Sequence, residues 1–185
     1  MVLIVFEGGE GVGKTTQVEL LYDALLRAKQ SALKTREPGG TPLAEKIRDL
    51  FKEKNNDPPK ALTELYLISA ARNQHVEQIL LPALAENKFI LCDRFIDSTY
   101  VYQSIVGGLK KEIVDKASRP VLHDVVPDLT FIFYCDPKIA HQRMRVQTHR
   151  TLDRLDSFTN SIHEKISLGY KEIYDNKYTY PSGVL

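Results

Sequence analysis

The sequence predicts an α/β fold in which a parallel sheet is doubly wound, with helices on both faces. Short apolar runs rich in β-branched residues alternate along the chain with longer helical segments. The clearest of these runs are continuously apolar, which is typical of strands covered on both faces. A glycine-rich loop also joins the first strand to the first helix. The expected order is β-α-β-α-α-β-α-β-α, which favours parallel strands joined by helical crossovers.

The elements can be placed from periodicity and from turn chemistry. We expect strands at residues 2–6, 32–35, 89–92 and 129–135. We expect helices at residues 14–29, 42–52, 62–86, 137–144 and 158–176, the third of them bent near Pro82. The second helix has the best-defined start, because Thr41 can cap it and Pro42 suits its first position.

Composition narrows the class of protein. The chain has 185 residues and 43% hydrophobic residues, which suits a single domain spanning residues 1–185. Its net charge of +1 argues against a nucleic acid as its main partner. No apolar run is long enough to cross a membrane, and no signal-peptide pattern is present, so we expect a cytoplasmic protein. Residues 184–185 resemble the start of another strand, so we expect the sequence to be cut short of its natural end.

A phosphate-binding loop follows the first strand. Residues 8–15 fit the pattern G-x-x-x-x-G-K-[ST] between a predicted strand and a predicted helix. Backbone N–H groups of such a loop wrap a phosphate, and the helix N-terminus adds its positive dipole end. Lys14 is expected to reach the β- and γ-phosphates, and the Thr15 hydroxyl to bind Mg²⁺. The expected nucleotide-binding residues are Gly8, Gly9, Glu10, Gly11, Val12, Gly13, Lys14, Thr15 and Thr16.

The third predicted strand ends in an acid and a base, Asp93 and Arg94. Ligands of open α/β sheets lie beyond the carboxyl ends of the strands, so Asp93 is a candidate second metal ligand and Arg94 a candidate anion ligand. Arg48 and Arg72 lie on predicted helices between the loop and Asp93. The alternatives are a surface ion pair for Asp93 and Arg94, and solvated helix faces for Arg48 and Arg72.

Several segments in order along nearly the whole chain resemble bacterial thymidylate kinases, a family of P-loop nucleoside monophosphate kinases. They are residues 6–17, 36–41 (Arg-Glu-Pro-Gly-Gly-Thr), 70–72 (Ala-Ala-Arg), 93–95 with Ser98 and Tyr102-Gln103, and 152–156 (Leu-Asp-Arg-Leu-Asp). The phosphate loop alone is generic, whereas the combination is specific. The resemblance implies transfer of the γ-phosphoryl group of Mg²⁺-ATP to dTMP, usually by a homodimer.

The resemblance also implies roles for individual residues. Arg48 and Arg94 would bind the 5′-phosphate of the acceptor, and Arg72 the thymine ring. Gln103 would lie beside the base and Tyr102 near the sugar, where it disfavours a ribose 2′-OH. The other substrate-side residues would be Glu10 near the sugar or the metal, Glu37 and Pro38 in the pocket wall, and Ser98.

The chain departs from the family pattern at several places. Ile68 stands where many relatives carry an aromatic residue that stacks on thymine. Phe95 and Ser104 replace a frequent tyrosine and a common glycine. The family's final helix is also missing from this sequence, which leaves the contacts to adenine open.

The negative charge of the transferring phosphoryl group must be neutralised, and this need predicts a second group of catalytic residues. The variable loop positions 9–12 contain no basic residue, whereas residues 143–157 carry four arginines and read as a mobile lid. Among Arg143, Arg145, Arg150 and Arg154, we expect Arg150 or Arg154 to act in catalysis together with Lys14, Asp93 and Arg94. The alternative is a solvated basic loop.

Two other classes of protein also carry a phosphate-binding loop of this kind. A deoxynucleoside kinase shares the fold and an Asp-Arg pair, but its acceptor offers no phosphate to Arg48 and Arg94. A GTP-binding switch protein would show a guanine-reading N-K-x-D segment after a strand, and the sequence has none.

Overall fold

A parallel sheet organises the computed structural model, which describes residues 1–53, 57–146 and 158–176. Its strands in the described part are β1 (Val2–Gly8), β2 (Ala32–Arg36), β3 (Phe89–Asp93) and β4 (Leu129–Phe133), in the order β2-β3-β1-β4. Phe6 of β1 pairs with Asp93, and Gly8 pairs with Phe133. The phosphate loop and Asp93 therefore emerge at the same edge of the sheet.

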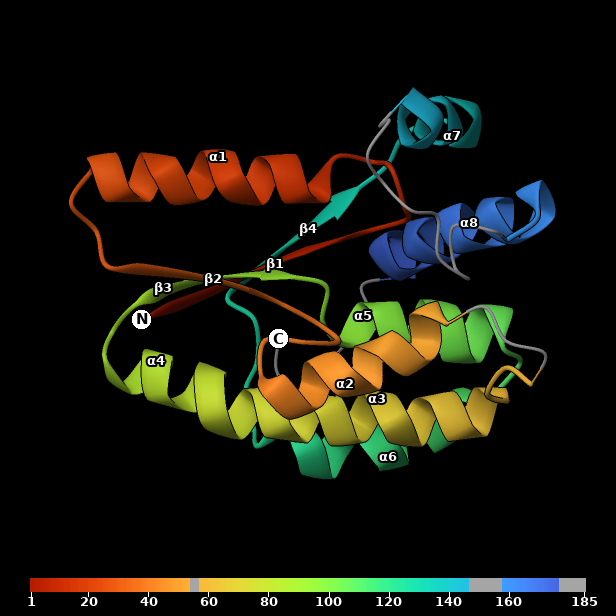
Figure 1. Cartoon of the computed structure of the whole chain (residues 1–185), viewed down its shortest axis with the longest axis horizontal. Coiled ribbons are helices and arrows are strands. Elements are labelled where there is room, and N and C mark those ends of the chain that lie inside the picture. Colours follow the sequence, from red (N-terminus) through yellow and green to blue (C-terminus); the bar gives the residue numbers. More distant parts are fainter. Residues whose placement is uncertain (54–56, 147–157, 177–185) are drawn as a thin grey trace.

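Helices cover both faces of the sheet, as the sequence predicts (Figure 1). In β1, Ile4 and Phe6 face α1 (Lys14–Arg27) and pack with Val18. Leu3 and Val5 alternate to the opposite face, where they join the larger core. The helices of that core include α3 (Ala61–His75), η1 (Val76–Leu80), α4 (Leu81–Ala85) and α6 (Lys111–Leu122). A strand with two buried faces needs apolar residues throughout, which explains the continuous run.

The remaining helices surround the edge of the sheet where the phosphate loop lies. They are α2 (Pro42–Lys52), α5 (Ile96–Thr99), η2 (Tyr100–Val106), α7 (Pro137–Val146) and α8 (Asn160–Asn176). The cap predicted for α2 is confirmed, because the Ala44 amide donates to the Thr41 hydroxyl at 3.2 Å and Pro42 opens the helix. In Figure 1, α7 and α8 lie at one end of the molecule beyond the sheet.

Three expectations from the sequence need correction. β4 ends at Phe133 and lies at the sheet edge of the described part, where Leu129 and Phe131 remain 45% and 43% exposed instead of covered. Two helical stretches, not one, separate β3 from β4, because the chain turns at Gly107 and Gly108 with positive φ at Gly108. The long helix at 62–86 contains a π-helical turn, η1, just before Pro82.

Some expectations fall on residues that the structure does not describe. Arg150, Arg154 and most of the expected lid lie outside the described residues, as do the strand-like residues 184–185. In the part of the chain that is described, no helix combines the length and apolar character needed to cross a membrane.

Candidate active site

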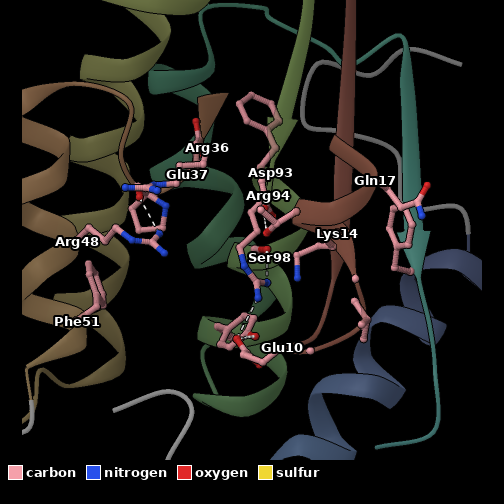
Figure 2. Close-up of a pocket in the computed structure, with 18 of the residues that line it drawn as sticks. Glu10, Lys14, Gln17, Arg36, Glu37, Arg48, Phe51, Asp93, Arg94 and Ser98 are labelled. Carbon is pink, nitrogen blue, oxygen red and sulfur yellow. Dashed lines mark hydrogen bonds and ion pairs between the residues drawn. The ribbon is translucent and has the colours of Figure 1, made fainter. Parts of the chain in front are cut away.

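A cavity of about 1230 Å³ opens at the carboxyl ends of the strands. That volume exceeds the usual range of roughly 300–1,000 Å³ for a single small-molecule site. Figure 2 shows Lys14 and Gln17 on one side of the cavity, with Arg36, Glu37, Arg48 and Phe51 on the other. Asp93, Arg94 and Ser98 lie between the two sides (Figure 2). The cavity therefore has room for two ligands that meet near Asp93 and Arg94.

Lys14 begins α1, and its side chain turns back into the phosphate loop. Its Nζ donates to the carbonyl oxygens of Gly8 at 3.0 Å and Gly9 at 2.6 Å. Burial, and next the charge of Arg94, lowers the pKa of Lys14 to about 8. An ammonium that is held only by carbonyl oxygens in a buried site would gain strongly from a phosphate.

The two predicted metal ligands are in contact. The Thr15 hydroxyl donates to Asp93 Oδ2 at 2.9 Å, although the two residues are far apart in the sequence. Both offer hard oxygen ligands, the type that Mg²⁺ requires, and Mg²⁺ usually completes its shell with water and substrate phosphates. This donor set fits Mg²⁺ bound together with a nucleotide triphosphate.

Two glycines of the phosphate loop are required by close approach. A Cβ on Gly8 would lie 2.5 Å from the Phe133 carbonyl oxygen, and a Cβ on Gly11 would lie 2.5 Å from that of Ala140. Both residues also have positive φ, at 140° and 71°. The loop thus packs directly against the end of β4 and against α7, which only glycine permits.

Arg94 occupies the centre of the site with a left-handed backbone, φ 73°. Its Nη1 donates to Gly8 O at 3.0 Å, to Ser98 Oγ at 3.2 Å and to Tyr170 Oη at 2.9 Å. Its Nη2 donates to Glu10 Oε1 at 3.0 Å. The strained conformation and the four partners indicate a guanidinium held in one place, which suits an anion site.

Glu10 carries the negative charge that balances this arginine. Burial alone would raise its carboxyl pKa, but Arg94 and then Lys14 hold that pKa below its usual value. Tyr102 also donates its hydroxyl to Glu10 Oε1. Glu10 Oε2 has no hydrogen-bond partner among the described residues and lies 3.9 Å from His163 Nδ1.

Glu37 lies in the far wall of the cavity and anchors Arg72. Arg72 Nε donates to Glu37 Oε2 at 2.7 Å, and its Nη2 donates to Phe95 O at 3.1 Å and Thr99 Oγ1 at 2.9 Å. Although burial opposes ionisation, Arg72 and His75 hold the pKa of the Glu37 carboxyl below its ordinary value. The lone charge of the apolar stretch around residue 72 therefore has its partner, and Arg72 is buried, not solvated.

Two polar atoms in this wall are left over. Arg72 Nη1 and Gln103 Oε1 are both buried, and neither has a hydrogen-bond partner in the described part of the chain. Gln103 Nε2 donates to Glu64 Oε2 at 3.0 Å, which fixes the amide so that its oxygen is the free atom. Both residues line the cavity. Buried polar groups are normally paired, so a free donor and a free acceptor make this wall a candidate ligand contact.

Several other predicted residues also line the cavity, with different surroundings. Arg48 Nη1 donates to the Pro38 carbonyl at 3.0 Å. Ser98 donates to Glu7 Oε2 at 2.6 Å, so it supports Arg94 as well as facing the cavity. Thr16 and Ile68 line the cavity, and Arg143 lies on α7 at its rim.

Sequence reasoning missed Glu7. This carboxylate is fully buried at the end of β1 and accepts hydrogen bonds from the Phe95 amide at 2.7 Å and the Ser98 amide at 3.1 Å. Tyr170 of α8 donates to its other oxygen at 3.1 Å. Burial raises the pKa of Glu7, an effect that Ser98 partly offsets. An acid inside an otherwise apolar strand was the signal that could have identified it.

His75 was missed as well. It is fully buried on α3, and its Nδ1 lies 2.9 Å from Glu37 Oε1. Its signal was its place on the same predicted helix as Arg72, three residues further on, because side chains at that spacing share one helix face.

The phosphate loop lies on one side of the cavity, and a wall that carries arginines lies on the other. This combination is typical of P-loop kinases that act on a nucleotide. Comparison with known proteins goes further. The family model described as thymidylate kinase matches residues 6–181. The chain belongs to the thymidylate kinase family.

Individual relatives agree with this assignment. Thymidylate kinase from Finegoldia magna is 42% identical over 94% of this chain and 85% of its own length. The enzyme from Acholeplasma laidlawii is 43% identical over 92% of this chain and 83% of its own length. The crystal structure of Ehrlichia chaffeensis thymidylate kinase superimposes with a TM-score of 0.73 at 33% identity, covering 95% of this chain and 85% of that one. The fold class is confirmed, and neither of the two rival classes is favoured.

The pKa of Lys14 predicts how nucleotide binding depends on pH. Below about pH 8 the ammonium is charged and meets the phosphates, and above that pH the free protein loses the proton. ATP affinity should therefore fall about tenfold between pH 7 and pH 9, since one pKa unit corresponds to a factor of ten. Lys14→Arg should bind more weakly at neutral pH but show no such fall, because arginine stays protonated. Titration calorimetry at several pH values measures this, and a wild-type affinity that does not change with pH would contradict it.

Proposed function

We propose that this chain transfers the γ-phosphoryl group of ATP to dTMP, giving dTDP. The family assignment supports the reaction. The observation that carries the choice of acceptor is the free donor and acceptor pair, Arg72 Nη1 and Gln103 Oε1. Thymine presents an acceptor, O4, next to a donor, N3–H. Cytosine presents the opposite pair at these positions, an amino group and an unprotonated N3, so this wall favours thymine.

The donor side follows from the phosphate loop. Lys14 would exchange its two carbonyl partners for the β- and γ-phosphates of ATP. Thr15 and Asp93 would hold Mg²⁺, which supplies positive charge to the transferring group when bound. The protein's own contribution is to position the phosphates and to keep Lys14 charged below about pH 8.

On the acceptor side, the 5′-phosphate of dTMP would lie in line with the phosphates of ATP. Arg94 lies between the two sides of the cavity and Arg48 on the side opposite Lys14, and both would bind the 5′-phosphate. Beside Arg94, Tyr102 donates its hydroxyl to Glu10. This hydrogen-bonded pair suits a deoxyribose, which has a 3′-OH but lacks the 2′-OH of ribose. A phosphate acceptor is already ionised at neutral pH, so the reaction needs alignment and charge neutralisation, not a strong general base.

Other features stay proposals. We propose a single domain over residues 1–185, a homodimer and a cytoplasmic location, with neither nucleic acid nor membrane as partner. Composition and the family resemblance support them. Light scattering would test the dimer against the monomer mass of 21.0 kDa.

The base-binding wall predicts acceptor selectivity. dUMP keeps both hydrogen bonds and loses one methyl group, so its kcat/KM should be about tenfold below that of dTMP. dCMP reverses both hydrogen bonds and should fall by about three orders of magnitude or more. A coupled assay with ATP and a panel of monophosphates and nucleosides measures this. The proposed function would be wrong if dCMP, GMP or thymidine were the best acceptor.

The arginines of residues 143–157 predict a second effect. Loop positions 9–12 carry no basic residue, so the charge of the transferring phosphoryl group needs a further cation besides Lys14. Arg150→Ala or Arg154→Ala should slow the chemical step at least about tenfold and leave dTMP affinity unchanged. Single-turnover rates decide it, with Arg143→Ala and Arg145→Ala as matched comparisons. If none of the four variants slows the chemical step, this segment plays no catalytic part.

A further inference from the structure

His75 links Thr35 of β2 to Glu37, which lies in the turn after that strand. Its Nε2 lies 2.7 Å from the Thr35 hydroxyl oxygen, and its Nδ1 lies 2.9 Å from Glu37 Oε1. Thr35 and Glu37 are two residues apart, so their side chains lie on the same side of the extended chain. The imidazole therefore bridges them from α3, in a position with no solvent exposure.

The hydrogen-bond roles follow from the carboxylate. Glu37 is held ionised, because its pKa lies below the ordinary value despite burial, and an ionised carboxylate only accepts hydrogen bonds. The Nδ1 of His75 must then carry a proton, and its Nε2 pairs with the Thr35 hydroxyl.

The ring cannot easily turn. A Cβ on Gly40 would lie 2.7 Å from His75 Cδ2, so the loop backbone packs closely against the imidazole. With hydrogen bonds at both nitrogens and this packing, His75 holds Glu37 Oε1 in a fixed direction.

This restraint acts on Arg72 through Glu37. Guanidinium and carboxylate groups favour a two-pronged pairing in which both carboxylate oxygens accept from one arginine. Here the pairing is single: Oε2 accepts from Arg72 Nε at 2.7 Å, and Oε1 lies beside His75 Nδ1. Arg72 Nη2 donates to Phe95 O and Thr99 Oγ1, and Nη1 is buried without a partner among the described residues.

We propose that His75 is a positioning residue for the nucleobase subsite, which holds the Glu37 carboxylate in one orientation and so fixes the Arg72 guanidinium for its contact with the base. Without His75, the Glu37 carboxylate can turn, and the guanidinium that it holds loses its fixed position. This inference rests on the proposed function, because it assigns Arg72 to the base of dTMP.

The test uses kinetics of the full chain. His75→Leu removes both hydrogen bonds with a side chain of similar size. Its KM for dTMP should rise about tenfold, the factor expected for losing one hydrogen bond to a charged group. The KM for ATP should stay within about twofold, because the phosphate loop does not contact His75. The preference for dTMP over dCMP should fall in the same variant.

Matched variants separate positioning from a general loss of structure. His75→Asn keeps an N–H near the place of Nδ1 and should recover most of the dTMP affinity. In an Arg72→Lys background, which lacks Nη1, His75→Leu should raise the KM for dTMP no further. If His75→Leu does not fold, Thr35→Val carries the test, because it breaks the Thr35 bond alone and should raise the KM for dTMP about threefold.

The outcomes are distinct. Unchanged dTMP KM and unchanged selectivity in a folded His75→Leu protein overturn the positioning role, as does a full, additive effect in the Arg72→Lys background. In the fallback case, an unchanged dTMP KM in Thr35→Val overturns it. An inactive wild type with dTMP overturns the proposed function instead, before any variant is compared.

Discussion

The guanidinium of Arg94 is the contact on which the site depends. Its hydrogen bonds reach the phosphate loop at Gly8 and Glu10, the start of α5 at Ser98, and α8 at Tyr170. These segments are far apart in the sequence, and the buried charge requires all of them at once. Glu7 strengthens the same junction, because it accepts from Ser98 and Tyr170 and from the Phe95 amide. The carboxyl ends of β1 and β3 and the face of α8 are thereby fixed relative to one another.

The basic groups of the cavity are engaged by the protein itself in this structure. Lys14 is bound to carbonyl oxygens, Arg94 to Glu10, and Arg72 to Glu37. A ligand phosphate must compete with these partners, so part of its binding energy goes into exchanging them. The wall that we propose for the base differs, because Arg72 Nη1 and Gln103 Oε1 lack partners among the described residues. Under the proposed function, the site combines exchangeable contacts for phosphates with preset contacts for the base.

The π-helical turns lie where helices approach this wall. η2 carries Tyr102 and Gln103, and η1 follows His75 directly. A π turn shifts the faces of a helix relative to a regular α-helix, which re-aims the side chains that it carries. The periodicity of the sequence predicted a helix at 62–86 but could not predict this shift, because an added residue in one turn leaves no local chemical signal.

The sequence by itself determined the features that arise from local chemistry. The phosphate loop at residues 8–15, the Thr41 cap and the buried strands β1 and β3 follow from neighbouring residues. The tertiary structure alone decided which groups far apart in the sequence form ion pairs and hydrogen bonds. It placed β4 at the edge of the described sheet, paired Arg72 with Glu37 across 35 residues, and set Glu7 and His75 behind the cavity. Such pairings depend on burial, since a charge taken out of water must find a partner wherever the fold supplies one.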